Sequence, residues 1–229
     1  MNSRMTQWMV VSVGMVAIAL GSATPSVSQS APGVILQRNG MLQAPEQEHL
    51  FNGMADQAVS ITLESQQFQG SMQVFDAAGN EIGLSDEYWS PESPLVLVLP
   101  TTGSYEVVAR SLYGNGGDYT VRVEAATPYV VALSQGRSLA RQGNFAEAIT
   151  AFERAIAMDS TEPRAHVELA EAVYAEATRL KPEDAAAVIH HYLHAAQLYE
   201  QQGEPDMARD LREQAGYLEQ QASGSPQWP

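Results

Sequence analysis

The period of the hydrophobic pattern changes once along this chain, at Thr127-Pro128. Over residues 34–126 apolar residues alternate with polar ones, which is the pattern of strands that bury one face. From residue 129 onward apolar residues recur every three or four positions, as on the buried face of a helix. We therefore expect an α+β chain of two domains. Because the joint between them is so short, the domains should sit against each other.

The alternating region contains about eight short apolar runs separated by turn residues. Turn residues occupy 78–80, 102–103 and 114–117, and PLVLVLP at 94–100 is a continuous apolar strand with proline at both ends. Short strands at this spacing are typical of an antiparallel β-sandwich. We assign residues 31–127 to this domain.

The most regular run in the chain is GNFAEAITAFERAIAMD, residues 143–159, whose apolar positions fall on one helix face. Asn144 is placed to cap this helix, with a glutamate three positions later as in a capping box. Gly143 suits the left-handed residue that ends a preceding helix. Residues 129–159 therefore predict an antiparallel helix pair.

This helix pair resembles the tetratricopeptide repeat (TPR), a 34-residue helix-turn-helix unit. The resemblance rests on Gly136, Leu139, Gly143-Asn144-Phe145, Ala148, Phe152 and Ala155. Ala132 stands where the family usually has a large aromatic residue, and Ser160 stands where it usually has proline. The alternative is an ordinary helical hairpin outside the family.

The helical pattern continues less regularly to residue 222. We expect one odd helix at about 162–180, capped by Ser160 or Thr161, and a second repeat-like pair at about 189–222. The TPR-like domain then spans 128–222 with five helices, followed by a disordered tail at 223–229. Since about three repeats are normally needed for stability, the sandwich, a second copy in a homodimer or a partner should cover some of its apolar surface.

The sandwich region resembles the bacterial pre-peptidase C-terminal domain. HLFNGMADQAVSITLES, SMQVFDAAGNEIG, VLPTTGSYEVVARS and GGDYTVRV follow the order of that family, and the Leu-Pro-x-x-Gly-x-Tyr run at 99–105 is among its most specific parts. The resemblance implies a secreted, jelly-roll-like accessory module. Ser85-Asp86-Glu87 departs from the Asp pair that members often carry, so the family's calcium role is not carried over to this chain.

Residues 1–30 have the pattern of a secretory signal peptide. Arg4 precedes an apolar stretch with a small, polar end, and we expect cleavage after Ser28 or Ser30. The alternative, an uncleaved membrane helix, needs about 20 apolar residues, and this stretch is shorter. We therefore expect a bacterial protein that is periplasmic or secreted, without a transmembrane segment after signal removal.

The composition restricts the chemistry. A net charge of −15 repels phosphate backbones, so we expect no nucleic-acid partner. The lack of cysteine excludes disulfides, thiolate metal sites and cysteine nucleophiles. The sequence contains no GxSxG, P-loop or HExxH motif, so we expect no enzymatic activity and no cofactor.

Two stretches superficially suggest a metal site. His190 and His194 in HHYLH are one helical turn apart, a spacing that can chelate zinc or nickel, but no carboxylate stands at zincin spacing. Solvated surface histidines are the favoured interpretation. Residues 76–81 lack the alternating oxygen ligands of a calcium loop, and we interpret them as a hairpin turn.

In the TPR family the first helix of each pair lines a concave face, and ligand contacts come from positions off the buried stripe. The resemblance implies the partner-binding residues Leu133, Arg137, Arg141, Val167, Glu171, Tyr174, His190, Leu193 and Gln197. Such a face suits a short extended or helical peptide with acidic character at one end. The alternative is that this face packs on the sandwich and is never free.

We therefore expect an exported, non-catalytic scaffold or adaptor that binds a protein or peptide partner through the TPR-like helices. A carbohydrate- or cell-envelope-binding module acting through the sandwich is the alternative, with Trp89 stacking on a sugar beside Asp86, Glu87 and Glu92. A hydrolase is the least favoured reading.

Overall fold

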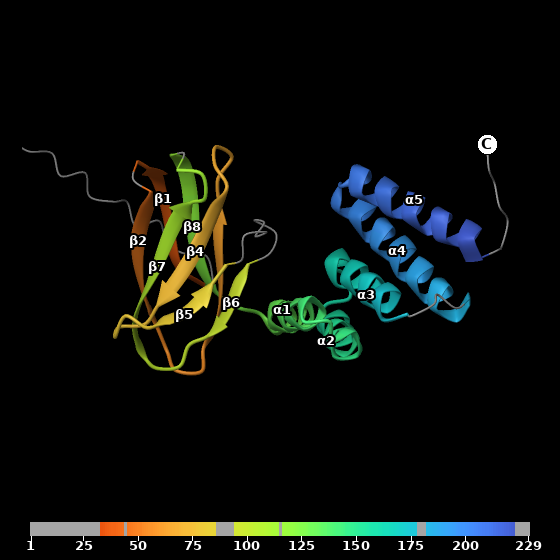
Figure 1. Cartoon of the computed structure of the whole chain (residues 1–229), viewed down its shortest axis with the longest axis horizontal. Coiled ribbons are helices and arrows are strands. Elements are labelled where there is room, and N and C mark those ends of the chain that lie inside the picture. The colour runs from red at the N-terminus through yellow and green to blue at the C-terminus, as the bar shows by residue number, and fades with distance from the viewer. Residues whose placement is uncertain (1–32, 44, 86–93, 115, 178–181, 223–229) are drawn as a thin grey trace, which may run out of the picture.

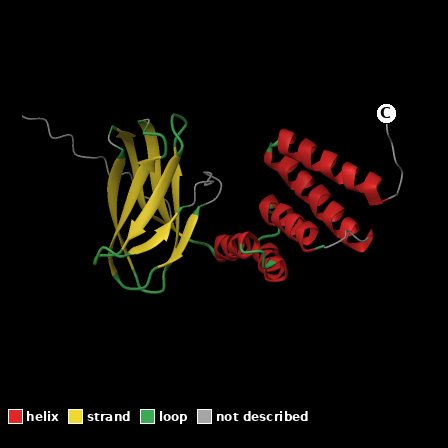
Figure 2. Cartoon of the chain, viewed as in Figure 1, coloured by secondary structure: helices red, strands yellow, loops and turns green. Residues whose placement is uncertain are grey.

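The computed structural model of the chain describes residues 33–222 except positions 44, 86–93, 115 and 178–181. Within this range eight β-strands precede five α-helices, and the two kinds of element are separated in space, as Figures 1 and 2 show. The chain passes from the last strand to the first helix through residues 126–127. The predicted order, a sandwich followed by helices, is confirmed. The expected signal at 1–30 and tail at 223–229 lie outside the described residues.

The strands form two antiparallel four-stranded sheets with the orders β1-β8-β3-β6 and β2-β7-β4-β5. Their bounds are β1 (Val34–Leu42), β2 (Glu46–Gly53), β3 (Ala58–Glu64), β4 (Gly70–Phe75), β5 (Glu81–Leu84), β6 (Leu95–Val98), β7 (Gly103–Ser111) and β8 (Gly117–Ala125). Consecutive strands thus lie in opposite sheets, except β4 and β5, which pair with each other in one sheet. This is the strand order of a jelly roll.

The two-residue alternation places one face of each strand between the sheets. Val59, Ile61 and Leu63 of β3 are fully buried, whereas Ser60 and Thr62 lie on the partly exposed face. The core between the sheets consists of residues from the sandwich alone, from Leu36 to Val123. The jelly roll therefore has a hydrophobic core of its own.

The Leu-Pro-x-x-Gly-x-Tyr run is a corner between the two sheets. Leu99 is fully buried, and its backbone N–H donates to the carbonyl of Gln57 at 2.9 Å. Tyr105 is buried in β7, and its hydroxyl donates back to the carbonyl of Thr101. A Cβ on Gly53 would lie 2.1 Å from Cδ1 of Leu99, so a side chain at this position of β2 would require Leu99 to shift.

The helices are α1 (Pro128–Arg141), α2 (Phe145–Met158), α3 (Pro163–Glu176), α4 (Pro182–Gln202) and α5 (Pro205–Ala222). Thr127 caps α1 by accepting the N–H of Val130 at 3.3 Å, and Pro128 opens the helix. Helix α4 begins at Pro182, since proline is favoured in the first turn of a helix, and the repeat-like pair predicted at about 189–222 lies within α4 and α5. Helix α3 is the predicted odd helix.

The two helix pairs have the same turn. Gly143 and Gly203 adopt φ of 79° and 84°, the left-handed conformation that favours glycine. After each glycine, the N–H of the next residue donates five positions back at 2.9 Å, from Asn144 to the Leu139 carbonyl and from Glu204 to that of Tyr199. The predicted alignment of Gly203 with Gly143 thus corresponds to a shared Schellman turn.

Two predicted caps differ in detail from the structure. Asn144 is the N-cap residue of α2, but its side chain makes no capping hydrogen bond. Helix α3 is preceded by Glu162 at the N-cap, rather than by Ser160 or Thr161. Thr161 instead donates through its hydroxyl to the carboxylate of Asp159 at 2.7 Å, which holds it in the turn before the helix.

Helix α3 joins two small cores into one array. Phe152 of α2 is fully buried in the first core, among residues of α1 and α3. The second core lies between α4 and α5 and receives Ala170 from α3. Gly136 of α1 is necessary for the first core, because a Cβ there would lie 2.4 Å from the Phe152 ring. Helix α3 thus contributes to both cores and connects the first helix pair to the second.

The fragment 31–127 is expected to fold by itself, because the jelly-roll core contains no helical residue. Chemical denaturation of this fragment, followed by near-ultraviolet circular dichroism, should give one cooperative transition. The same transition should appear in the full chain at a similar denaturant concentration. A gradual, non-cooperative loss of signal from the fragment would mean that the helices complete the sandwich.

Candidate protein-binding surfaces of the helical array

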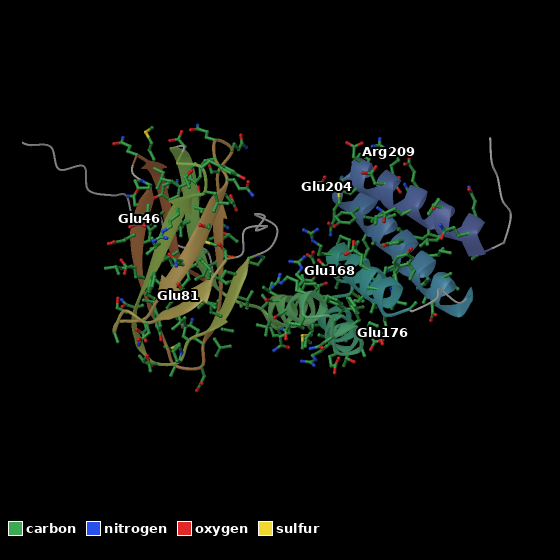
Figure 3. All side chains as sticks on the ribbon, in the orientation of Figure 1. Glu46, Glu81, Glu168, Glu176, Glu204 and Arg209 are labelled. Atoms are coloured by element: carbon green, nitrogen blue, oxygen red, sulfur yellow. The ribbon has the colours of Figure 1, made fainter. Side chains whose placement is uncertain are left out.

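A groove of about 880 Å³ lies between the open edge of the sandwich and the helices. One wall is formed by β6 and the end of β5, each of which lies at one edge of its sheet. Helix α1, the start of α3 and the turn between α4 and α5 contribute the other wall. Figure 3 shows Glu168 and Glu204 on the side of the array that faces the sandwich. We refer to this space as the interdomain groove.

The position of β6 at the edge of its sheet explains why its sequence is apolar without alternation. It pairs with β3 on one side only, from Ala58 opposite Val98 to Ile61 opposite Leu95. Leu95 and Leu97 pack against the sandwich core, whereas Val98 is 60% exposed and lines the groove. One face of β6 therefore covers the core, and the other offers apolar surface to the groove.

An ion pair fixes α1 to α3 at the groove. Nη2 of Arg137 lies 2.7 Å from Oε1 of Glu168, and Nε of the same guanidinium donates to that oxygen at 2.7 Å. Both side chains are mostly buried, so the pair is less screened by solvent than a surface pair. The sequence prediction treated Arg137 as a partner contact. In the structure its guanidinium is engaged with Glu168.

The groove has a mixed electrostatic character. Arg141 and Arg164 line it together with Arg137, and the carboxylates of Glu162 and Glu204 lie among them. Burial, and secondly the charge of Glu162, raises the pKa of Tyr129 to about 12. The Tyr129 hydroxyl at the groove therefore stays protonated at physiological pH and remains able to donate a hydrogen bond.

The predicted partner-binding residues do not all line one pocket. Leu133, Arg137 and Arg141 line the interdomain groove, but Leu133 is buried in the array core. Tyr174 lines a separate hollow between α3, α4 and α5. The rest of the set lines neither space and consists of Val167, Glu171, His190, Leu193 and Gln197. Of these, Val167 packs against the second core.

The histidines of HHYLH have a buried partner that the sequence prediction missed. Nδ1 of His191 lies 3.1 Å from Nδ1 of His166 in α3, and the rings of His166 and His194 pack edge to face at 4.5 Å between centroids. His166 is only 6% exposed. His190 is exposed, as expected of a solvated histidine, whereas His191 and His194 are partly exposed and pack against His166.

Burial is the main reason why the neutral form of His166 is favoured. Desolvation, followed by the charges of His194 and His191, lowers the pKa of His166 to about 4. Desolvation and the neighbouring histidines also lower the pKa of His191. The sequence did contain a signal for the burial of His166. It precedes the buried residues Leu169 and Ala170 by three and four positions, so it lies on the same face of the helix.

Other candidate sites have a structural explanation or lie outside the described residues. The carboxylate of Asp76 accepts hydrogen bonds from Ala78 and Asn80, which closes the turn between β4 and β5 as predicted. Trp89 and its acidic neighbours are among the positions that the structure does not describe. Where the chain is described, no three His, Asp or Glu side chains are arranged to hold a metal, and no helix is long and apolar enough to cross a bilayer.

Comparison with known families identifies the repeats. A TPR repeat model matches residues 136–176, and a tetratricopeptide repeat model matches residues 189–214. The first match covers the end of α1 and all of α2 and α3, and the second covers the turn between α4 and α5 that resembles the turn between α1 and α2. These two parts of the helical domain are therefore similar to tetratricopeptide repeats. No curated protein matches the chain.

Several solved structures are similar to part of the chain. PliG of Aeromonas hydrophila, a periplasmic inhibitor of g-type lysozyme, is 16% identical over 43% of this chain and 93% of its own, with a TM-score of 0.35. PliG of Salmonella Typhimurium is 12% identical over 44% and 95%, with a TM-score of 0.32. The pre-peptidase C-terminal domain of Bacillus anthracis collagenase is 12% identical over 40% and 90%, with a TM-score of 0.34.

Proposed function

We propose that this chain, a jelly roll followed by tetratricopeptide repeats, is an exported, non-catalytic adaptor that binds a protein segment in the interdomain groove. The observation that carries the proposal is the groove itself, which brings repeat helices and an open sheet edge to one space. Helical repeats bind proteins along extended surfaces. The groove therefore supports the proposal that a protein segment binds at this place.

The shape of the groove favours an extended segment. Strand β6 has a neighbour on one side only, so its other edge is suited to pair with an added strand. Val98 and Met207, on opposite walls, are 60% and 40% exposed and provide apolar contacts. Arg141 and Arg164 favour an acidic residue in the bound segment.

The double variant Val98→Ser/Met207→Ser is expected to lose partner capture while keeping its thermal midpoint. Both side chains are exposed, so their loss removes contact area from the groove without opening the core. Retention of partner on immobilised full-length protein, from extracts of the bacterial envelope, measures the effect.

Leu50→Ser is the matched control, because Leu50 is 67% exposed on β2, which pairs with β7 far from the groove in strand order. This control should capture the partner as the wild type does. If capture survives in the double variant but is lost in Trp89→Ala, the binding surface is on the sandwich and the groove proposal fails.

Export is proposed on the pattern of residues 1–30. Protein recovered from the secreting host should begin near residue 29 or 31, with Arg4 and the apolar stretch removed. Intact-mass spectrometry of the recovered protein measures this. A soluble product in the cytoplasm that retains Met1 would contradict the proposal.

A further inference from the structure

A second hollow, of about 490 Å³, lies between α3, α4 and α5. It is lined by Tyr174, Tyr192, Asp210, Glu213, Gln214, Tyr217 and Leu218. It shares no lining residue with the interdomain groove. We refer to it as the tyrosine hollow.

The lining of the tyrosine hollow combines exposed and buried apolar side chains. Tyr174 of α3 and Tyr217 of α5 are 50% and 62% exposed, whereas Tyr192 and Leu218 are buried. Burial, followed by the charges of Glu171 and Tyr174, raises the pKa of Tyr192 to about 12. Tyr192 therefore remains neutral at physiological pH, and the exposed rings of Tyr174 and Tyr217 offer electron-rich faces.

The charge of the tyrosine hollow has one sign. Asp210 and Glu213 line it, and the lining includes no cationic side chain. Asp210 lies 3.4 Å from Arg209 of its own helix, but Arg209 is closer to Asp206, at 2.9 Å. The whole chain carries −15, and removal of residues 1–30 with Arg4 would make this −16. The hollow thus attracts cations and repels anions.

We propose that the tyrosine hollow binds an arginine or lysine side chain of the protein partner. The cation lies against the faces of Tyr174 and Tyr217 and pairs with Asp210 and Glu213, so that ring and carboxylate contacts act together. An uncharged apolar segment fits less well, because it would remove two carboxylates from water without compensation. This inference rests on the proposed function only in that the cation belongs to a protein.

The two surfaces therefore select for opposite charges. The interdomain groove contains arginines and favours an acidic residue, whereas the tyrosine hollow favours a basic one. A partner that engages both surfaces needs residues of both signs, spaced as the groove and the hollow are. Such a pairing adds specificity, because a segment with one charge of the wrong sign is repelled.

The test compares two peptides that differ in charge and little in shape. Ac-Gly-Arg-Gly-NH2 is titrated into isotopically labelled full-length protein, and Ac-Gly-citrulline-Gly-NH2 serves as its neutral counterpart. Amide resonances of residues 171–175 and 210–218 should shift in a saturable manner with the arginine peptide. The citrulline peptide should bind at least about five-fold more weakly, which corresponds to about 1 kcal/mol for the cation. Equal binding of the two peptides overturns the proposal.

Variants separate the ring and carboxylate contributions. Asp210→Asn/Glu213→Gln and Tyr174→Leu/Tyr217→Leu should each weaken arginine-peptide binding at least about five-fold. Glu219→Gln is the control, because Glu219 is exposed on α5 and does not line the hollow. Unchanged binding in both double variants contradicts the proposal.

The groove variant distinguishes failure of this inference from failure of the proposed function. Val98→Ser/Met207→Ser, which removes groove contacts, should bind the arginine peptide as the wild type does. Loss of partner capture in that variant with intact peptide binding therefore tests the groove alone.

Discussion

Replacing Phe152 with alanine is expected to lower the free energy of unfolding of the helical array by about 3–5 kcal/mol. Phe152 is fully buried between α1, α2 and α3, so alanine leaves a cavity that the surrounding helices fill only in part. Urea unfolding of the full chain, followed by circular dichroism at 222 nm, measures the loss.

Phe145→Ala is the matched control for this change, because Phe145 lies in the first turn of the same helix and is only partly buried. Phe145→Ala should lower the free energy of unfolding clearly less than Phe152→Ala does. The close contact of Gly136 with the Phe152 ring gives a second test. Gly136→Ala should destabilise the wild type more than it destabilises Phe152→Ala, since the small side chain leaves room for the added methyl group. A loss below about 1 kcal/mol for Phe152→Ala would mean that the helix faces another way.

Acidification from pH 7 to pH 4 is expected to destabilise the helical array by on the order of 2 kcal/mol through His166. The folded state holds the pKa of His166 at about 4, whereas the unfolded chain has the ordinary value of 6.5. Below pH 6.5 the unfolded state therefore binds more protons. The stabilisation is fully present above pH 6.5 and is lost as the pH falls toward 4. The expected loss is smaller than the full pKa shift of His166 would give. His190 beside the cluster is exposed, so water screens the charges of the histidines.

Urea unfolding at pH 7, 5.5 and 4.5 measures this dependence. His166→Leu removes the buried imidazole and should flatten the loss of stability between these values. His190→Gln should keep the wild-type dependence. Burial also lowers the pKa of His49 in the sandwich, which acts in the same direction. The difference between wild type and His166→Leu isolates the cluster, and parallel pH profiles for the two proteins would contradict the prediction.

Local patterns were sufficient to predict the elements and their order. The alternation of Val59, Ile61 and Leu63 identified a strand with one buried face, and the run around Phe152 identified a helix with one buried stripe. Gly143 and Gly203 marked two equivalent turns, because each needs a left-handed backbone that glycine adopts without strain. These properties depend on a residue and its near neighbours in the chain, so the sequence by itself determined them.

The site depended on contacts that no local pattern contains. The spacing that placed Arg137 and Tyr174 on exposed helix positions gave no information on how α1 and α3 are rotated against α4 and α5. Packing of the helices directed Arg137 to Glu168 and Tyr174 to the hollow beside Tyr217. It also brought His166 against His191 across 25 positions of sequence. A hydrophobic period determines which face of a helix is buried, but only the tertiary packing decides which side chains of different helices meet.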